Sequence, residues 1–127
     1  MLRAFVLSIL LLLPFGAQAE TLLPDLDLKG IIRVHNMRFD VTFHRGMFGG
    51  VWIEKDENGQ DMEVFADWYG TRLTVTARYP HTLEDTDEKL ALDVAYRFCD
   101  ENHLKRKPEP SNSRFEDVTW IFEDACE

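Results

Sequence analysis

The two cysteines constrain this chain more than any other pair of residues. Cys99 lies in a stretch with the pattern of a helix, and Cys126 is the penultimate residue. A disulfide between them would join the helix to the end of the last strand. It would close a loop of about 28 residues, which stabilises a fold by roughly 3–4 kcal/mol in the chain-entropy model. Reactive thiol pairs typically have the close C-x-x-C spacing, which is absent here, so we predict a structural disulfide.

The stretch 85–103 is the helical segment on which the fold prediction depends. Asp85 is placed as its N-cap, and Glu88 follows three residues later in a capping-box pattern. At 100° per residue, one stripe of the helix collects apolar side chains, and we expect this stripe to lie on a sheet. The stripe consists of Leu90, Ala91, Val94, Ala95 and Phe98.

The first 19 residues have the pattern of a secretory signal peptide. Arg3 supplies the positive charge, residues 5–15 form an apolar run, and small residues precede the cleavage point after Ala19. The apolar run is about half the ~20 residues that span a bilayer. We therefore predict cleavage, no stable membrane anchor afterwards, and a periplasmic or secreted protein, in agreement with a disulfide. Residues 20–127 are then a single small domain.

Alternation of apolar and polar residues predicts strands before and after the helix. The expected strands lie within residues 31–35, 38–44, 51–68, 71–79 and 118–126. Together with the helix they predict an α+β fold, with a mostly antiparallel sheet of five or six strands and one helix packed on one face. The C-terminal strand and the Cys99–Cys126 disulfide would close this domain.

The dipeptide Asn36-Met37 is interpreted as the turn of the first hairpin. In this register Val34 faces Phe39, so that apolar side chains meet across the two strands.

A second hairpin is expected around Asn58-Gly59, a dipeptide typical of two-residue type I′ turns. Trp52 would then face Phe65 on one side of the hairpin, and Val51, with its neighbours on the other side, would cover the core. The Trp52–Phe65 side would be covered by the tail or would remain an open aromatic patch.

Two glycine-containing segments, 45–50 and 67–70, are interpreted as turns between strands. The first would raise Met47 and Phe48 to a loop tip. Two interpretations of that tip stay open. Both side chains fold back over the end of the core, or they form an exposed apolar contact loop of the kind that often carries binding.

Large apolar side chains near these turns are the candidate binding residues. They are Met47, Phe48, Trp52, Phe65 and Trp68.

The charge balance limits the classes of partner. The chain has 23 acidic and 14 basic residues and a net charge of −9. Nucleic acids and anionic membranes need clustered lysine and arginine, so neither is an expected partner. The acidic surface would keep an exported protein soluble, and it would favour a basic protein partner.

No motif for catalysis, cofactor binding or metal binding stands out. After residue 19 the serines are Ser111 and Ser113, with no G-x-S-x-G, and the histidines lack H-x-x-x-H spacing. We therefore expect a non-catalytic binding or accessory domain with no catalytic residues, no cofactor and no metal. Two alternatives stay open. One is a small-ligand or divalent-cation module using the acidic turn 56–63, whose glycine departs from EF-hand spacing. The other is a small hydrolase using paired carboxylates.

Overall fold

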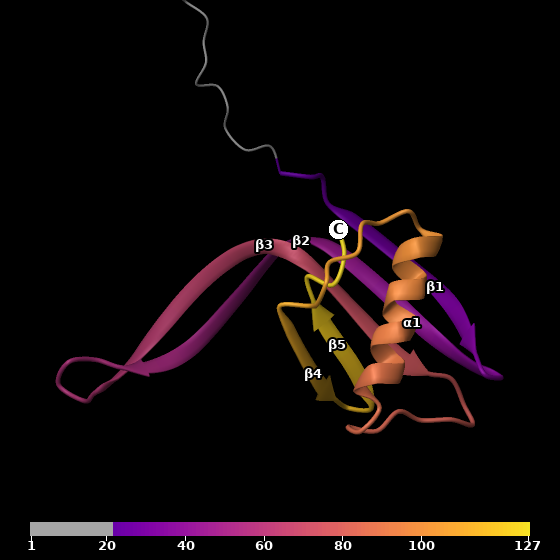
Figure 1. Ribbon diagram of the computed structural model, residues 1–127. Helices are drawn as coiled ribbons and strands as arrows, with labels where there is room; N and C mark the ends of the chain where they lie inside the picture. The colour runs from indigo at the N-terminus through magenta and orange to yellow at the C-terminus, as the bar shows by residue number, and fades with distance from the viewer. Residues whose placement is uncertain (1–21) are drawn as a thin grey trace, which may run out of the picture.

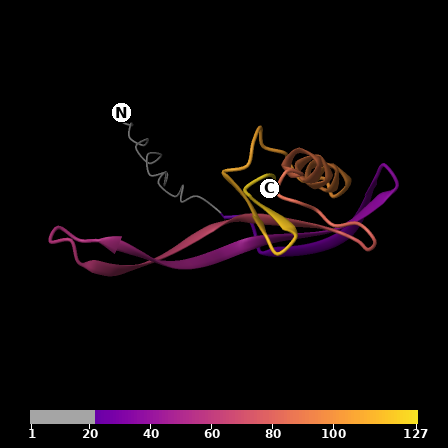
Figure 2. The same ribbon diagram turned by 90° about the horizontal axis from the view of Figure 1, so that it is seen from below.

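The computed structural model describes residues 22–127, so the signal peptide predicted for residues 1–19 lies outside the described residues. Five antiparallel strands form one open sheet in the order β1-β2-β3-β5-β4, and a single helix covers one face (Figures 1 and 2). This confirms the predicted α+β fold. The elements are β1 (Leu26–Val34), β2 (Met37–Lys55), β3 (Asp61–Ala77), α1 (Glu88–Glu101), β4 (Asn112–Glu116) and β5 (Thr119–Glu123).

The core lies between α1 and the sheet, as the helical stripe predicted. Ala91, Val94, Ala95 and Phe98 of that stripe are buried, and Leu90 packs at the margin of the core. From the sheet, alternate residues of β1, β2, β3 and β5 point at the helix because side chains alternate across a strand. The largest of these fully buried side chains are Phe39, Phe43, Leu73 and Phe122.

The helix begins two residues later than the capping-box pattern predicted. Asp87, rather than Asp85, is the N-cap residue, and no side-chain hydrogen bond caps the helix. The Asp87 carboxylate instead accepts the backbone N–H of Glu84 at 2.8 Å. The carboxylate thus bonds to the loop before the helix, and the first turn of α1 starts at Glu88.

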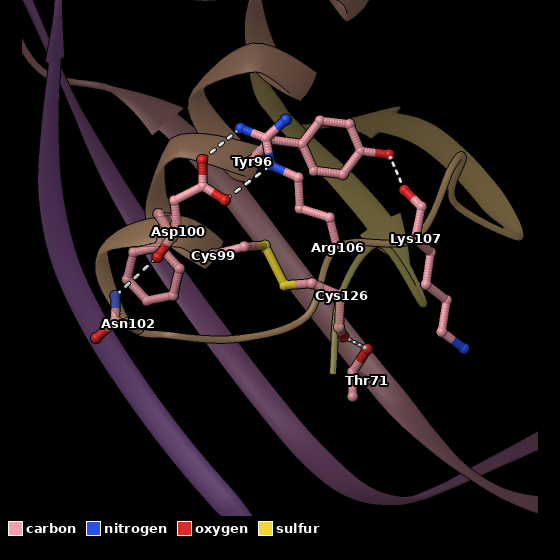
Figure 3. The surroundings of a disulfide bond; sticks show 9 residues. Thr71, Tyr96, Cys99, Asp100, Asn102, Arg106, Lys107 and Cys126 are labelled. Atoms are coloured by element: carbon pink, nitrogen blue, oxygen red, sulfur yellow. Dashed lines mark hydrogen bonds and ion pairs between the residues drawn. A yellow bond between two sulfur atoms is a disulfide. The ribbon is translucent and has the colours of Figure 1, made fainter.

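The predicted disulfide is present and completely buried. Cys99 of α1 is bonded to Cys126, which follows β5 (Figure 3). The Thr71 hydroxyl donates to the backbone oxygen of Cys126 at 2.7 Å, so β3 also holds this tail. The cross-link therefore ties the helix to the C-terminal tail, which β3 holds in turn.

A polar cluster beside the disulfide holds the segment after α1. Arg106 donates two hydrogen bonds to Asp100 and lies over the Tyr96 ring at 4.9 Å (Figure 3). The hydrogen bonds lower the pKa of the Asp100 carboxyl and raise the pKa of Arg106. The Tyr96 hydroxyl donates to the backbone oxygen of Lys107 at 2.9 Å, and burial raises the pKa of Tyr96.

The first hairpin turns at His35 and Asn36, so the predicted Asn36-Met37 turn is wrong by one residue. His35 and Asn36 have φ values of 51° and 66°, the positive pair that a type I′ turn requires. Val34 consequently pairs with Met37 instead of Phe39. The register moves by two residues, which leaves the same side chains facing the core because the side-chain period of a strand is two.

The C-terminal region is a hairpin of two strands, where a single strand was predicted. Asp117 and Val118, with φ values of 48° and 56°, form the turn between β4 and β5. Trp120 and Phe122 still point into the core, as their alternation indicated. Val118 is exposed at the turn, and β4 becomes an edge of the sheet.

Candidate functional site

The long hairpin of β2 and β3 extends well past the rest of the sheet. β1 pairs with β2 only as far as Arg45, and β5 pairs with β3 only from Arg72 onward. Beyond these points residues 47–68 form a two-stranded ribbon that has no neighbouring strand among the described residues and projects from the body (Figures 1 and 2). We call residues 47–68 the arm and the remaining described residues the body.

The predicted turns at 45–50 and 67–70 are wrong, because both segments lie within these continuous strands. Gly46 pairs with Gly70 across the ladder at the base of the arm. Glycine within a strand often marks a bend or a close approach of other groups. A Cβ on Gly70 would lie 2.8 Å from a carboxylate oxygen of Asp124, so here the glycine permits close approach of the C-terminal tail.

The tip of the arm has a longer loop than the two residues predicted. The Asp56 backbone oxygen accepts the N–H of Gly59 at 3.0 Å, and the Asp56 N–H donates to Gln60 at 2.9 Å. Gly59 has a φ of 80°, so Glu57 to Gly59 form the three-residue loop that combines a type I turn with a left-handed residue.

The extra loop residue moves the register of the arm by one. Trp52 faces Val64 and Val51 faces Phe65, so the predicted pairing of Trp52 with Phe65 is wrong. A shift of one residue changes which side chains share a side of the ribbon. It separates the candidate binding residues into two groups.

Both sides of the arm carry exposed apolar side chains. Phe65 is 70 % exposed and Met47 is 58 % exposed, and neither covers the core. One side holds Met47, Val51, Ile53 and Phe65, and the other holds Phe48, Trp52, Met62, Val64 and Trp68. Val51, Ile53 and Met62 were not among the predicted site residues, because the expected register placed the first two over the core. We include them in the candidate site because they are exposed apolar side chains on the arm.

On the second side the aromatic side chains are stacked in a row. The rings of Phe48 and Trp68, which are cross-strand partners, lie 6.1 Å apart between centroids and 25° from parallel. The Arg72 guanidinium lies 4.3 Å from the centroid of Phe48, and the His44 ring contacts the same ring edge-on at 5.2 Å. Phe48 is thus fixed at the base of the arm, on the face of the sheet without the helix.

The row of aromatic rings continues over Gly50 to Trp52. A Cβ on Gly50 would lie 3.3 Å from the Trp68 ring and 3.9 Å from the Trp52 ring, so both indoles lie over this glycine. The Trp52 indole N–H donates to Glu54 at 2.9 Å. The result is an aromatic surface with defined ring positions, which lowers the entropy lost on binding.

The arm is strongly acidic as well as apolar. Residues 47–68 contain six acidic side chains and one basic side chain, Lys55. Lys55 forms an ion pair with Asp61 at 2.5 Å, and the other five carboxylates of the arm form no ion pair with any residue of 22–127.

A hollow of about 510 Å³ lies at the base of the arm, with Trp68 and Arg72 on one side and β4 on the other. Glu123 in its wall is only 9 % exposed. Arg72 donates to this carboxylate at 2.7 Å and Arg114 donates to it at 3.0 Å. The hollow is therefore held in shape by charge-assisted hydrogen bonds, which are among the stronger ones.

The acidic turn has the geometry of a hairpin loop. The Asp56 carboxylate accepts the backbone N–H groups of Asn58 and Gln60, at 2.8 Å and 2.9 Å. Among residues 22–127, no three side chains of histidine, cysteine, aspartate or glutamate are grouped so that they could hold a metal ion.

A larger hollow, of about 620 Å³, lies elsewhere, between α1 and the β1–β2 hairpin. Two neighbouring carboxylates, Asp100 and Glu101, contribute to its lining. A general acid requires a raised pKa, whereas the hydrogen bonds from Arg106 lower the pKa of Asp100. Asp100 therefore lacks the raised pKa of a glycosidase acid.

Comparison with known proteins gives no relative: no family model, no curated protein and no solved structure matches the chain. None of the described helices is long and apolar enough to cross a membrane.

Proposed function

We propose that this protein is a non-catalytic binding module that uses the arm to dock into a basic protein partner. The observation that carries the proposal is the set of exposed apolar side chains on a ribbon that nothing else in the described chain covers. Monomeric proteins rarely expose contiguous apolar surface of this kind unless it has an interaction role. Aromatic side chains are also the residues that most often dominate binding energy at interfaces.

The distribution of apolar residues supports a partner with a cleft. Phe65 and Trp52 lie on opposite sides of the ribbon, and both are exposed. A flat partner surface would cover one side and leave the other in water. A cleft that encloses the arm would bury both sides, and the hollow beside Trp68 would accept a protruding group of the partner.

The charge of the arm supports a basic partner over a second copy of this chain. Six carboxylates and one lysine in residues 47–68 would repel the same segment of another molecule. Lysine and arginine around a cleft would complement this charge and accelerate association, an effect that salt would weaken. The acidic composition of the whole chain acts in the same direction.

The disulfide and the lack of a membrane-spanning helix among the described residues are compatible with an exported protein. Together with the signal-peptide pattern of residues 1–19, they support a periplasmic or secreted location.

The two alternative functions have less support. A cation site at the acidic turn would need several oxygen ligands, yet Asp56 bonds to backbone N–H groups and Asp61 to Lys55. A hydrolase would need paired carboxylates with raised and ordinary pKa values, and the pKa of Asp100 moves in the opposite direction.

The proposal is tested by affinity capture from an extract of the exported fraction, with the mature protein as bait at low and high salt. Wild type should retain a basic protein at low salt and release it at high salt. Phe65→Asp and Trp52→Asp should each lose that protein, because each places a charge on one side of the arm. Direct titration of the purified partner should then show the same order of affinities.

Val118→Asp is the matched control, since it makes the same kind of change at an exposed apolar residue of the body. It should bind like wild type. Equal capture by the arm variants and by Val118→Asp would contradict the proposal, as would an acidic partner whose binding is insensitive to salt.

A further inference from the structure

A second surface, at the other end of the molecule from the arm, has the opposite charge. The hollow of about 620 Å³ between α1 and the β1–β2 hairpin is lined by three arginines, Arg33, Arg38 and Arg97. Figures 1 and 2 show the arm and the β1–β2 turn at opposite ends of the sheet. In a chain with a net charge of −9, a groove with three arginines in its lining is unexpected.

These arginines have no acidic partners in the described part of the chain. No carboxylate of residues 22–127 forms an ion pair with Arg33, Arg38 or Arg97. Asp100 also lines the hollow, but its carboxylate already accepts two hydrogen bonds from Arg106. Glu101 is the remaining carboxylate of the lining. Three cations against one free carboxylate leave the groove with a positive charge.

Two of the arginines repel each other across the hairpin. Arg33 and Arg38 are direct cross-strand partners, and like charges in this arrangement destabilise a sheet. A bound anion would relieve this repulsion, because guanidinium groups form strong hydrogen bonds with carboxylates.

The same groove runs beside an edge of the sheet that pairs with no other strand of residues 22–127. β1 is an edge strand of nine residues. The backbone oxygen of Arg38 accepts a hydrogen bond from Arg78, on the β3 side. In an antiparallel ladder the N–H and C=O of one residue point to the same neighbour. Arg38 therefore makes no backbone hydrogen bond with Arg33, and the backbone groups of Arg33 point outward.

By the same alternation, the N–H and C=O groups of Ile31 and Lys29 also point away from β2. Among residues 22–127 no backbone hydrogen bond reaches them from that side. Charged side chains on an edge strand often serve only to block pairing. Here they stand beside a hollow that extends to α1, and the Ile31 side chain next to it is 49 % exposed.

We infer that the β1 edge binds an extended acidic peptide segment of another protein. The peptide would add a sixth strand to the sheet through main-chain hydrogen bonds to Ile31 and Arg33. Its carboxylates would contact Arg33, Arg38 and Arg97. Strand addition of this kind obtains affinity from the backbone and specificity from side-chain contacts in the adjacent groove. The arm plays no part in it, so this surface stands independently of the function proposed above.

The test uses a fluorescent eight-residue peptide of alternating glutamate and valine, titrated by anisotropy at low salt. Wild type should bind it. A peptide with lysine in place of glutamate should not bind, and a glutamate peptide N-methylated at alternate residues should bind at least about tenfold more weakly, since its main-chain donors are blocked. Arg33→Thr combined with Arg97→Gln should also reduce affinity at least about tenfold.

Ile31→Pro removes the outward N–H of β1 without breaking the ladder to β2, because proline is tolerated on edge strands at this kind of position. Ile31→Val keeps that N–H and is the matched control. Ile31→Pro should weaken peptide binding and Ile31→Val should not, while thermal unfolding confirms that both variants fold. Equal binding by the two variants would overturn strand addition.

The charges would also allow the acidic arm of another copy of this chain to occupy the groove. Sedimentation tests this alternative, because it would make the protein self-associate. Wild type should sediment as a monomer at the concentrations of the titration. Self-association that is lost in Arg33→Thr would assign the groove to a second copy and overturn the peptide proposal.

Discussion

The body and the arm use apolar side chains in opposite ways. In the body, residues such as Phe122 and Phe39 are completely buried between α1 and the sheet, and the Cys99–Cys126 disulfide fixes that arrangement. In the arm, Phe65 and its neighbours remain in water although they belong to the same two strands as the core. The apolar surface of the arm is thus not needed to form the core, which leaves it available to a partner.

A two-stranded hairpin alone is at most marginally stable in water. The arm has a folded shape because β2 and β3 are already paired inside the body, where β1 and β5 flank them. Residues of the body therefore stabilise the fold, whereas the arm holds the residues that we propose to bind, and substitutions in the two regions should behave differently.

The largest contrast is expected for one phenylalanine in each region. Phe122→Ala should lower the free energy of unfolding by about 3–5 kcal/mol, because it leaves a cavity in a packed core. Phe65→Ala, at a side chain that is 70 % exposed, should change it by less than about 0.5 kcal/mol. Urea unfolding of both variants measures the difference, and a loss of several kcal/mol in Phe65→Ala would show that the arm belongs to the core.

Removal of the disulfide should have the next largest effect. The double variant Cys99→Ala, Cys126→Ala should be less stable than wild type by about 3 kcal/mol, since the unfolded chain loses its cross-link. Alanine suits the site because both sulfurs are buried. If the arm is a separate binding element, the folded fraction of this variant should still bind the partner. Titration of the folded variant with the partner measures this binding.

The smallest effect should come from the exposed pair Asp100–Arg106 in the body. Hydrogen bonds from Arg106 lower the pKa of Asp100 in the folded state. Its stabilising contribution is therefore fully present above the unfolded pKa, near 4, and is lost as the pH falls through the lower folded pKa. Asp100→Asn should melt slightly below wild type at pH 7, and the two should converge in acid. A difference in melting temperature that stays constant down to pH 2 would contradict the assignment of this stabilisation to the Asp100 carboxylate.

The helix, the disulfide and the fold class were predictable from the sequence because each depends on a local or compositional signal. The apolar stripe from Leu90 to Phe98 repeats at the helical period, and the two cysteines of the chain have one simple pairing. Strand alternation also predicted strands in the segments that contain β3 and β5.

The turns were harder to predict, because the same residue types occur in turns and in strands. Gly46 and Gly70 resemble loop residues in the sequence, yet they pair inside a ladder. Asn58-Gly59 correctly indicated a hairpin, but the local sequence does not distinguish a two-residue loop from the three-residue loop that forms. That one residue determined which aromatic side chains share a side of the arm.

The candidate binding residues could be selected by type but not by position. Trp52, Phe65 and Trp68 were identified as large apolar residues near turns, and they lie on the arm. The arm is exposed because β1 and β5 end before it begins, and this depends on the order and the lengths of the strands. Those pairings join segments far apart in the sequence, so the exposure of Val51 and Ile53 could not be predicted.

The most direct test of the separation between body and arm is to shorten the arm. Replacing residues 49–67 with Asn-Gly would join Phe48 to Trp68, which are already cross-strand partners, by a type I′ turn. Urea unfolding and partner capture would then be measured on the same preparation. The account predicts stability within about 1 kcal/mol of wild type, since isolated hairpins are marginal, and complete loss of the captured basic protein. An unfolded or strongly destabilised variant, or one that still captures the partner, would contradict it.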